Sequence, residues 1–226
     1  MTLSEIFCHN FPSIGISAPH YSPEEISRLQ NLLCKFVDEI SLFNKRMNLV
    51  AADSSEQIAK NHVLDCLAAV PILKQKIFLQ KTEIKVADLG SGAGFPGIPL
   101  AAAFPEIKWT LVERMVKRST FLQGTVAQLG LKNVEVFQGD FADVPAETFD
   151  FATFRAFHPF EESLLKNIFR LLKTHGTVLA YKAKTEKILE EMRDFPQWVS
   201  NYKIFPLKCD FLPDHQRNLV VFKKNV

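Results

Sequence analysis

Apolar residues recur along this chain at two spacings, one typical of helices and the other of buried strands. Residues 26–43 carry apolar side chains at steps of three and four, which predicts a long amphipathic helix that ends near Asn44. Ser22 supplies a hydroxyl cap just before this helix. A second helix is expected over residues 56–70. Residues 1–21 show little periodicity and are expected to form a loosely ordered or docked arm.

Beyond residue 76, short apolar runs alternate with helical segments. Seven runs have the length and composition of strands, at residues 84–89, 107–113, 133–137, 149–154, 176–180, 202–207 and 218–223. Helices are expected at residues 115–129, 161–173 and 185–193, and in an Ala-rich segment that reaches residue 104. This order predicts an α/β fold: a mostly parallel seven-stranded sheet with an antiparallel C-terminal hairpin, preceded by N-terminal helices.

Length and composition suit either one generous domain or one domain with an appendage. We expect residues 1–75 to form an arm and a helical cap, packed as one unit with a sheet domain at residues 76–226. The net charge is only +2, but residues 166–226 hold 12 Lys and Arg against 6 Asp and Glu. That excess fits either a face that binds a polyanion or a solvated surface of mixed charge.

The four cysteines form no C-x-x-C pair, which argues against a zinc site and against a disulfide scaffold. They suit a reducing cytosol, and we expect a cytoplasmic protein. No secretion signal and no apolar run of membrane-spanning length is visible in the sequence.

A glycine-rich turn, Gly-Ser-Gly-Ala-Gly at residues 90–94, follows the strand at residues 84–89. A strand, a glycine turn and a helix in this order bring backbone N–H groups to the edge of a sheet, where they bind ligands. A tight connection without a ligand is the alternative. Three glycines in five residues, with Asp88 just before them, favour the binding site.

Two cofactor classes use such a turn. Gly92, Gly94 and Gly97 match the G-x-G-x-x-G pattern of dinucleotide enzymes, but this spelling leaves Gly90 unexplained. The other spelling, Asp88-x-Gly90-x-Gly92-x-Gly94, resembles motif I of S-adenosylmethionine-dependent methyltransferases.

Further candidates follow other predicted strands, so they should converge on the same rim of the sheet. Glu113 lies about twenty residues past the glycines, where an acid accepts hydrogen bonds from ribose hydroxyls in both cofactor classes. Phe141 and Ala142 follow the third strand and could clamp an adenine, and Arg155 follows the fourth. No His paired with an acid is evident in the second half for hydride transfer, which favours the methyltransferase.

His62 and Asp65 are neighbours at helical spacing and could form a hydrogen bond. An ordinary pair on a helix surface is the favoured interpretation from these two residues alone. No third partner suggests a nucleophilic triad.

The motifs together resemble the bacterial small-subunit ribosomal RNA (guanine-N7) methyltransferases of the glucose-inhibited division protein B family, over about residues 25–224. The resemblance rests on Asn48-Leu-Val-Ala51, His62-x-x-Asp65-x-Leu67, Asp88-x-Gly-Ser-Gly-x-Gly-Phe-Pro-Gly-Ile-Pro-Leu100, Lys117-Arg-x-x-Phe-Leu122, Arg155-Ala156, Tyr181-Lys182 and Arg217-Asn-Leu-Val-Val221. The Gly-Phe-Pro-Gly-Ile-Pro-Leu run is specific, since generic methyltransferases lack it. Cys66, Ala183 and Asn218 depart from the usual Ser, Gly and His.

The resemblance implies a Rossmann-like methyltransferase fold and methyl transfer from S-adenosylmethionine to N7 of a guanosine in small-subunit rRNA. No general base is expected, because guanine N7 has a free lone pair and no proton to lose. No metal is expected either. The residue roles that the resemblance implies are Gly90, Gly92 and Phe95 at the methionine end of the cofactor, Glu113 on the ribose, Phe141 and Ala142 at the adenine, Arg155 on the cofactor carboxylate or an RNA phosphate, Lys182 and Arg217 on RNA phosphates, and Asn48, His62 and Asp65 beside the guanine.

The expected substrate is naked rRNA or a 30S particle, and the expected enzyme is a monomer. A methyltransferase acting on another RNA or on a small molecule, an NAD-dependent oxidoreductase and a non-catalytic nucleotide-binding module remain the alternatives.

Overall fold

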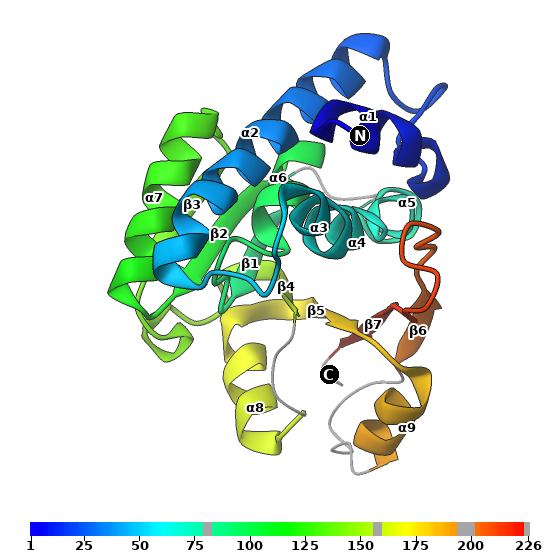
Figure 1. Ribbon diagram of the computed structural model, residues 1–226. Coiled ribbons are helices and arrows are strands. Elements are labelled where there is room, and N and C mark those ends of the chain that lie inside the picture. The colour runs from blue at the N-terminus through cyan, green and yellow to red at the C-terminus, as the bar shows by residue number, and fades with distance from the viewer. Residues whose placement is uncertain (79–82, 156–159, 194–201, 224–226) are drawn as a thin grey trace.

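The protein is seen here as a computed structural model that describes residues 1–78, 83–155, 160–193 and 202–223 (Figure 1). A seven-stranded sheet runs through its centre in the order β3-β2-β1-β4-β5-β7-β6. The strands are β1 (Lys85–Leu89), β2 (Lys108–Glu113), β3 (Val134–Gln138), β4 (Phe149–Arg155), β5 (Leu172–Lys182), β6 (Lys203–Pro206) and β7 (Asn218–Lys223). The first five strands pair in parallel, and β7 is antiparallel to both β5 and β6. The predicted sheet and its antiparallel C-terminal edge are confirmed.

Helices cover both faces of the sheet, as a parallel sheet requires (Figure 1). On one side lie α6 (Gly97–Ala103), α7 (Val116–Leu129) and the N-terminal helices, and their apolar residues join one hydrophobic cluster. On the other side, α8 (Glu162–Leu171) and α9 (Thr185–Arg193) pack into a second cluster. The carboxyl ends of β1 to β5 meet at one edge between these layers.

The helix α6 packs so closely on the sheet that all of its residues are buried. A Cβ on Gly97 would lie 2.3 Å from Leu111 Cδ2 and 2.6 Å from Asp88 Oδ2, so only glycine fits at this position. Because α6 starts directly after the glycine-rich turn, this contact fixes the turn at the carboxyl end of β1.

The first residues form an ordered, docked segment rather than a loosely ordered arm. They contain α1 (Leu3–Asn10), whose start is a capping box in which Glu5 N–H donates to Thr2 Oγ1 at 3.2 Å and Thr2 N–H donates to Glu5 Oε2 at 2.8 Å. Phe7 and Phe11 are buried in the core. The helix has only eight residues, so its apolar spacing is too brief to stand out in the sequence.

The long N-terminal helix, α2 (Pro23–Met47), begins after the predicted cap Ser22 but continues past Asn44. It ends at Asn48, which has a φ of +48°. The Asn44 side chain accepts a hydrogen bond from Val50 N–H at 2.9 Å and donates to the Val50 carbonyl oxygen at 3.0 Å. Asn44 therefore pins the loop after the helix instead of ending the helix itself.

The helix predicted over residues 56–70 is broken by a wider turn. Its pieces are α3 (Ser55–Ile58), a π-helical turn (Ala59–Leu64), α4 (Asp65–Leu67) and α5 (Val70–Ile72), followed by a second π-helical turn (Leu73–Ile77). Apolar spacing alone does not distinguish an α-helical turn from a π-helical one.

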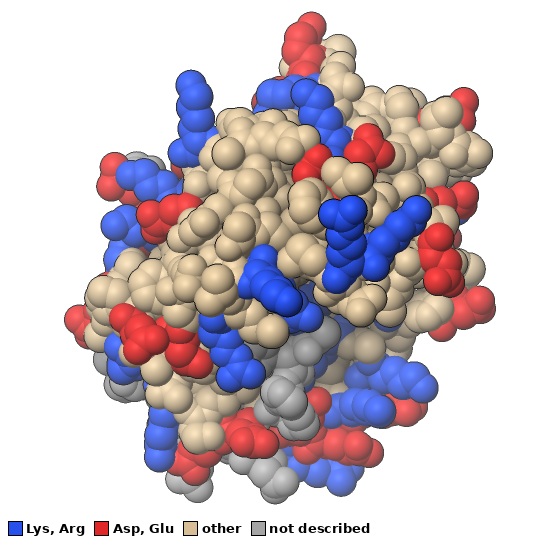
Figure 2. Space-filling view, turned by 60° about the vertical axis from the view of Figure 1, so that its left-hand side comes forward, with Lys and Arg blue, Asp and Glu red and all other residues tan. Residues whose placement is uncertain are grey.

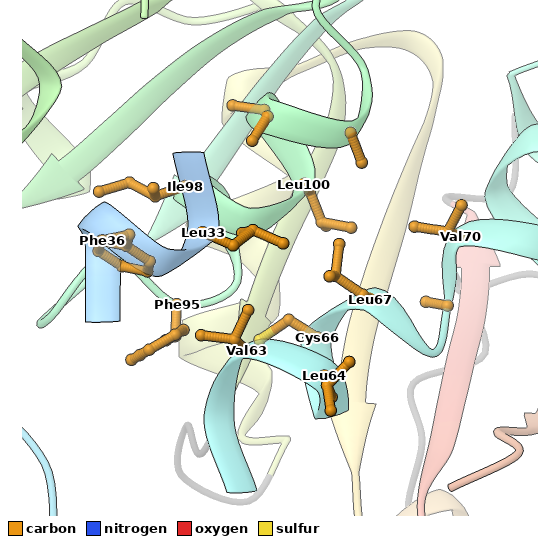
Figure 3. Packing of buried hydrophobic residues seen from close by; sticks show 14 of the residues in the cluster. Leu33, Phe36, Val63, Leu64, Cys66, Leu67, Val70, Phe95, Ile98 and Leu100 are labelled. Carbon is orange, nitrogen blue, oxygen red and sulfur yellow. The ribbon is translucent and has the colours of Figure 1, made fainter. Parts of the chain in front are cut away.

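The expected cap and the sheet domain share one hydrophobic core. In Figure 3, Leu33 and Phe36 of α2, Leu67 of α4, and Ile98 and Leu100 of α6 point toward one another. The division near residue 75 stays a prediction, but no separate core supports it among these residues.

The boundary between α8 and β5 differs from the prediction. The helix ends at Leu171 rather than at residue 173, and the strand begins at Leu172 rather than at Gly176. Leu172 is buried and pairs with Phe149 of β4, so the sheet takes this residue although its spacing also suits the helix.

Candidate active site

The glycine-rich turn joins β1 to α6 at the carboxyl edge of the sheet. The φ angles are +70° at Gly90 and +57° at Gly92, in the left-handed region that glycine adopts without strain. A Cβ on Gly92 would have only the Gly90 carbonyl oxygen within 4 Å, at 3.9 Å. This side of the turn is therefore open to a ligand that approaches the backbone.

Glu113 ends β2 beside this turn. Its Oε2 accepts a hydrogen bond from Gly92 N–H at 2.9 Å, and its Oε1 accepts one from Met115 N–H at 2.8 Å. The side chain is buried. The structure thus brings Glu113 and the glycines together, where the sequence predicts them.

Phe141 and Ala142 lie in a short 3-10 turn that follows β3. Gly139 N–H donates to the Glu113 carbonyl oxygen at 3.1 Å, which joins the start of this loop to the end of β2. Arg170 donates to the carbonyl oxygens of Phe141 and Ala142 at 3.0 and 2.8 Å. The loop therefore lies next to Glu113 with a fixed backbone.

Asp88 lies beneath the turn and is fully buried. Its Oδ2 accepts a hydrogen bond from Gly97 N–H at 3.0 Å, whereas its buried Oδ1 has no partner among the described residues. Burial raises the pKa of this carboxyl to about 7. A buried carboxyl oxygen without a partner beside an open glycine turn fits a polar group of a ligand.

Asp65 lies between two arginines at the adjoining part of this edge. Its Oδ1 is 2.8 Å from Arg217 Nε, and its Oδ2 is 3.3 Å from Arg155 Nε. Arg155 ends β4 and Arg217 directly precedes β7, while Asp65 begins α4, so three distant segments meet at one carboxylate. Burial raises the pKa of Asp65, and the two guanidinium groups act against this effect.

The remaining donors of Arg155 reach the π-helical turn. They donate to the carbonyl oxygens of Asn61 and His62 at 2.9 and 3.2 Å, and one contacts His62 Nδ1 at 3.0 Å. π-helical turns often occur at functional sites. Here the turn directs two carbonyl oxygens and one imidazole nitrogen toward the guanidinium of Arg155.

The His62 ring lies against Phe95 with the ring centres 5.3 Å apart. Burial, followed by the nearby Arg155 charge, lowers the pKa of His62 to about 4, so the imidazole is neutral at neutral pH. Because Nδ1 faces the Arg155 donor, the proton belongs on Nε2, which is buried. A hydrogen bond to the backbone of Ala51 acts against the lowering of this pKa. His62 and Asp65 therefore do not form the surface pair favoured from their spacing, because both side chains face inward.

The two cations predicted to bind RNA already have partners within the protein. Lys182 Nζ lies 2.7 Å from Glu191 Oε2 and 4.1 Å from the centre of the Phe160 ring. Arg217 is held by Asp65, as described above. Asn48, predicted beside the guanine, is exposed at the end of α2 and has no hydrogen bond to His62 or Asp65 in the structure.

Two residues of this network were not among the predicted site residues. Tyr181 donates its hydroxyl to the Cys66 carbonyl oxygen at 2.8 Å, and Arg155 Nη1 lies 3.5 Å from Cys66 Sγ. Tyr181 directly precedes the predicted Lys182 at the end of β5. This neighbour is the sequence signal that could have identified Tyr181. Its partner Cys66 lies more than 100 residues away, so the sequence does not indicate this contact.

Within the described residues, no group of three or more His, Cys, Asp and Glu side chains is arranged to hold a metal ion. In the same part of the chain, no helix has both the length and the apolar character needed to cross a membrane.

The raised pKa of Asp88 predicts a pH-dependent stability. Between about pH 4 and pH 7 the unfolded carboxyl ionises while the folded one keeps its proton, so stability falls as pH rises through this window. The loss is on the order of 2–4 kcal/mol. Asp88→Asn lacks this titration, so the free energy of unfolding of the variant relative to wild type should rise between pH 4.5 and 7.5 in urea titrations. Parallel pH profiles of the two proteins would contradict a protonated Asp88.

The chain is similar to known proteins over most of its length. The family model described as GidB, rRNA small subunit methyltransferase G, matches residues 29–220. A protein named ribosomal RNA small subunit methyltransferase G from Treponema denticola is 34% identical over 223 residues, covering 88% of this chain and 87% of the relative. One of the same name from Treponema pallidum is 39% identical over 194 residues, covering 84% and 82%.

Solved structures support the fold. The tRNA (m1A58) methyltransferase TrmI of Aquifex aeolicus matches with a TM-score of 0.55 and 18% identity, covering 72% of this chain and 68% of that one. A SAM-dependent methyltransferase from the same organism matches with a TM-score of 0.52 and 19% identity, covering 68% and 88%. The Rossmann-like methyltransferase fold is confirmed, and so are the family resemblance and the S-adenosylmethionine-dependent rRNA methyltransferase that it implied. By sequence and by fold, this chain belongs to the GidB family, rRNA small subunit methyltransferase G.

Proposed function

We propose that this protein transfers a methyl group from S-adenosylmethionine to N7 of a guanosine in small-subunit rRNA. The observation that carries the proposal is the open glycine turn, with the Glu113 carboxylate on Gly92 and the unpartnered Asp88 oxygen beneath it. We expect the enzyme to act as a monomer in the cytoplasm, on rRNA or on the 30S particle.

The residues at this edge fit the cofactor. Gly90, Gly92 and Phe95 would surround its methionine end, with the Asp88 carboxyl beneath them. The Glu113 carboxylate would accept hydrogen bonds from the ribose hydroxyls. Phe141 and Ala142 would flank the adenine. When bound, S-adenosylmethionine supplies a methyl group already activated on a sulfonium.

The protein's contribution is then orientation rather than proton transfer. Guanine N7 has a free lone pair, so no general base is required. Holding N7 in line with the methyl group and the sulfur lowers the activation barrier substantially. His62, predicted beside the guanine, is neutral at neutral pH. A neutral imidazole adds no positive charge beside a base that becomes positively charged on methylation.

Arg155 and Asp65 support this arrangement by holding other residues in position. Arg155 fixes the turn that carries His62, and Asp65 balances the charge of Arg155 and Arg217. Lys182 and Arg217 remain candidates for phosphate contacts, each from within an existing ion pair. A phosphate would have to compete there with Glu191 or Asp65.

The function is tested by labelled methyl transfer onto unmodified small-subunit rRNA and 30S particles. The expected product is 7-methylguanosine, with binding of S-adenosylmethionine but not of NAD in calorimetric titrations. Binding of NAD alone would exclude a methyltransferase. Cofactor binding with transfer only to another RNA or to a small molecule would leave the cofactor site intact and overturn the rRNA substrate.

Glu113 gives a specific prediction for the cofactor. Glu113→Gln should weaken S-adenosylmethionine binding by roughly 10- to 100-fold, because hydrogen bonds to a charged acceptor contribute about 1.5–3 kcal/mol. Glu135→Gln is the matched control: Glu135 is on the neighbouring strand β3, and its carboxylate accepts from Thr110 Oγ1 at 2.7 Å. Calorimetry should find the control unchanged. Equal S-adenosylmethionine affinities for all three proteins would show that Glu113 does not bind the ribose hydroxyls.

A further inference from the structure

The helices α2 and α7 pack side by side in opposite directions (Figure 1). Glu39 of α2 accepts a hydrogen bond from Gln128 of α7, and further along α2 the ring centre of Phe43 lies 5.4 Å from that of Phe121. The residue numbers rise along one helix as they fall along the other. The last turn of α2 therefore lies beside the first turn of α7.

Exposed apolar side chains gather at these two helix ends. Leu42 and Phe43 near the end of α2 are 67% and 38% exposed, and Met115 and Val116 at the start of α7 are 51% and 61% exposed. Only two other large hydrophobic side chains are as exposed in the described parts of the chain. Their exposure leaves them available for contact with a partner.

Five cations lie next to these apolar residues in the sequence, namely Lys45, Arg46, Arg114, Lys117 and Arg118. None of the five makes an ion pair within the described residues, unlike Lys182 and Arg217. Figure 2 turns the α7 side of the molecule forward and shows Lys and Arg side chains across this face, with uncharged surface and some Asp and Glu side chains between them.

The stability of the helices does not account for the cations on α7. The positive end of the helix dipole disfavours cations at a helix N-terminus, and the first turn of α7 has no acidic residue to offset Lys117 and Arg118. The nearest acid, Glu113, is buried and directed toward Gly92 and Met115 N–H. By contrast, Lys45 and Arg46 at the end of α2 suit the dipole of that helix.

We propose that this surface, formed by Leu42, Phe43, Lys45, Arg46 and residues 114–118, is where the RNA substrate docks. The inference rests on the proposed function and deepens it, because the surface starts directly after Glu113 at the rim of the cofactor site. Unpaired cations match the phosphates of a strand, and the exposed ring of Phe43 matches an unstacked base, with apolar neighbours beside it. A protein interface fits less well, since lysine is depleted in protein contacts.

The charge of the surface is tested by the double variant Arg114→Ala, Lys117→Ala. At about 0.1 M salt, losing two phosphate contacts should weaken binding of unmodified small-subunit rRNA by roughly 25- to 60-fold and reduce the salt slope by about 1.4–1.8. Lys108→Ala, Lys132→Ala is the matched control, because both lysines are exposed at the opposite edge of the sheet. The control should keep wild-type RNA affinity, and all proteins should bind S-adenosylmethionine equally.

The apolar part is tested separately by Val116→Ser, which should lower RNA affinity without changing the salt slope. Suppose that the wild-type enzyme methylates rRNA, but the double charge variant binds RNA with the same affinity and salt slope as wild type. That result would overturn the docking surface and leave the proposed function standing. A wild-type enzyme that transfers no methyl group to rRNA would instead overturn the proposed function, and this inference with it.

Discussion

The buried carboxylate of Asp65 is the interaction on which the arrangement of this edge depends. An isolated carboxylate in the interior is costly, and removing one partner of a buried ion pair leaves an uncompensated charge. Asp65 avoids that cost only when Arg155 and Arg217 both reach it, one from the end of β4 and the other from the start of β7. The helical segment that carries Asp65 is thereby held against the carboxyl ends of the strands.

That docking has a consequence for the chemistry. Arg155, once fixed, holds the π-helical turn by donating hydrogen bonds to its carbonyl oxygens. The His62 ring then lies on Phe95 at the edge of the glycine turn. The proposed cofactor side of the site comes from the sheet, through the glycine turn and Glu113. The proposed guanine side comes from a segment that precedes the sheet in the chain. An ion pair across 152 residues joins the two halves.

The sheet and the cofactor side follow from local patterns, which explains why they are predictable from the sequence. Apolar runs of strand length, the glycine turn and an acid after the next strand each carry their own signal. The guanine side depends on contacts between distant residues. Spacing predicts that His62 and Asp65 are neighbours, but it favours a surface pair, because nothing in the sequence indicates that Arg155 and Arg217 will reach them. Likewise, charge alone does not reveal that Lys182 is already paired with Glu191.

The most direct measurement is amide hydrogen exchange in wild type and Asp65→Asn, which keeps the side-chain shape and removes the charge. If Asp65 holds the cap against the sheet, the variant should exchange faster across Ala59–Leu64 and α4, while the far strands β2 and β3 keep their wild-type protection. Unchanged protection of the π-helical turn in the variant would contradict the account, since the segment would then be docked by hydrophobic packing alone.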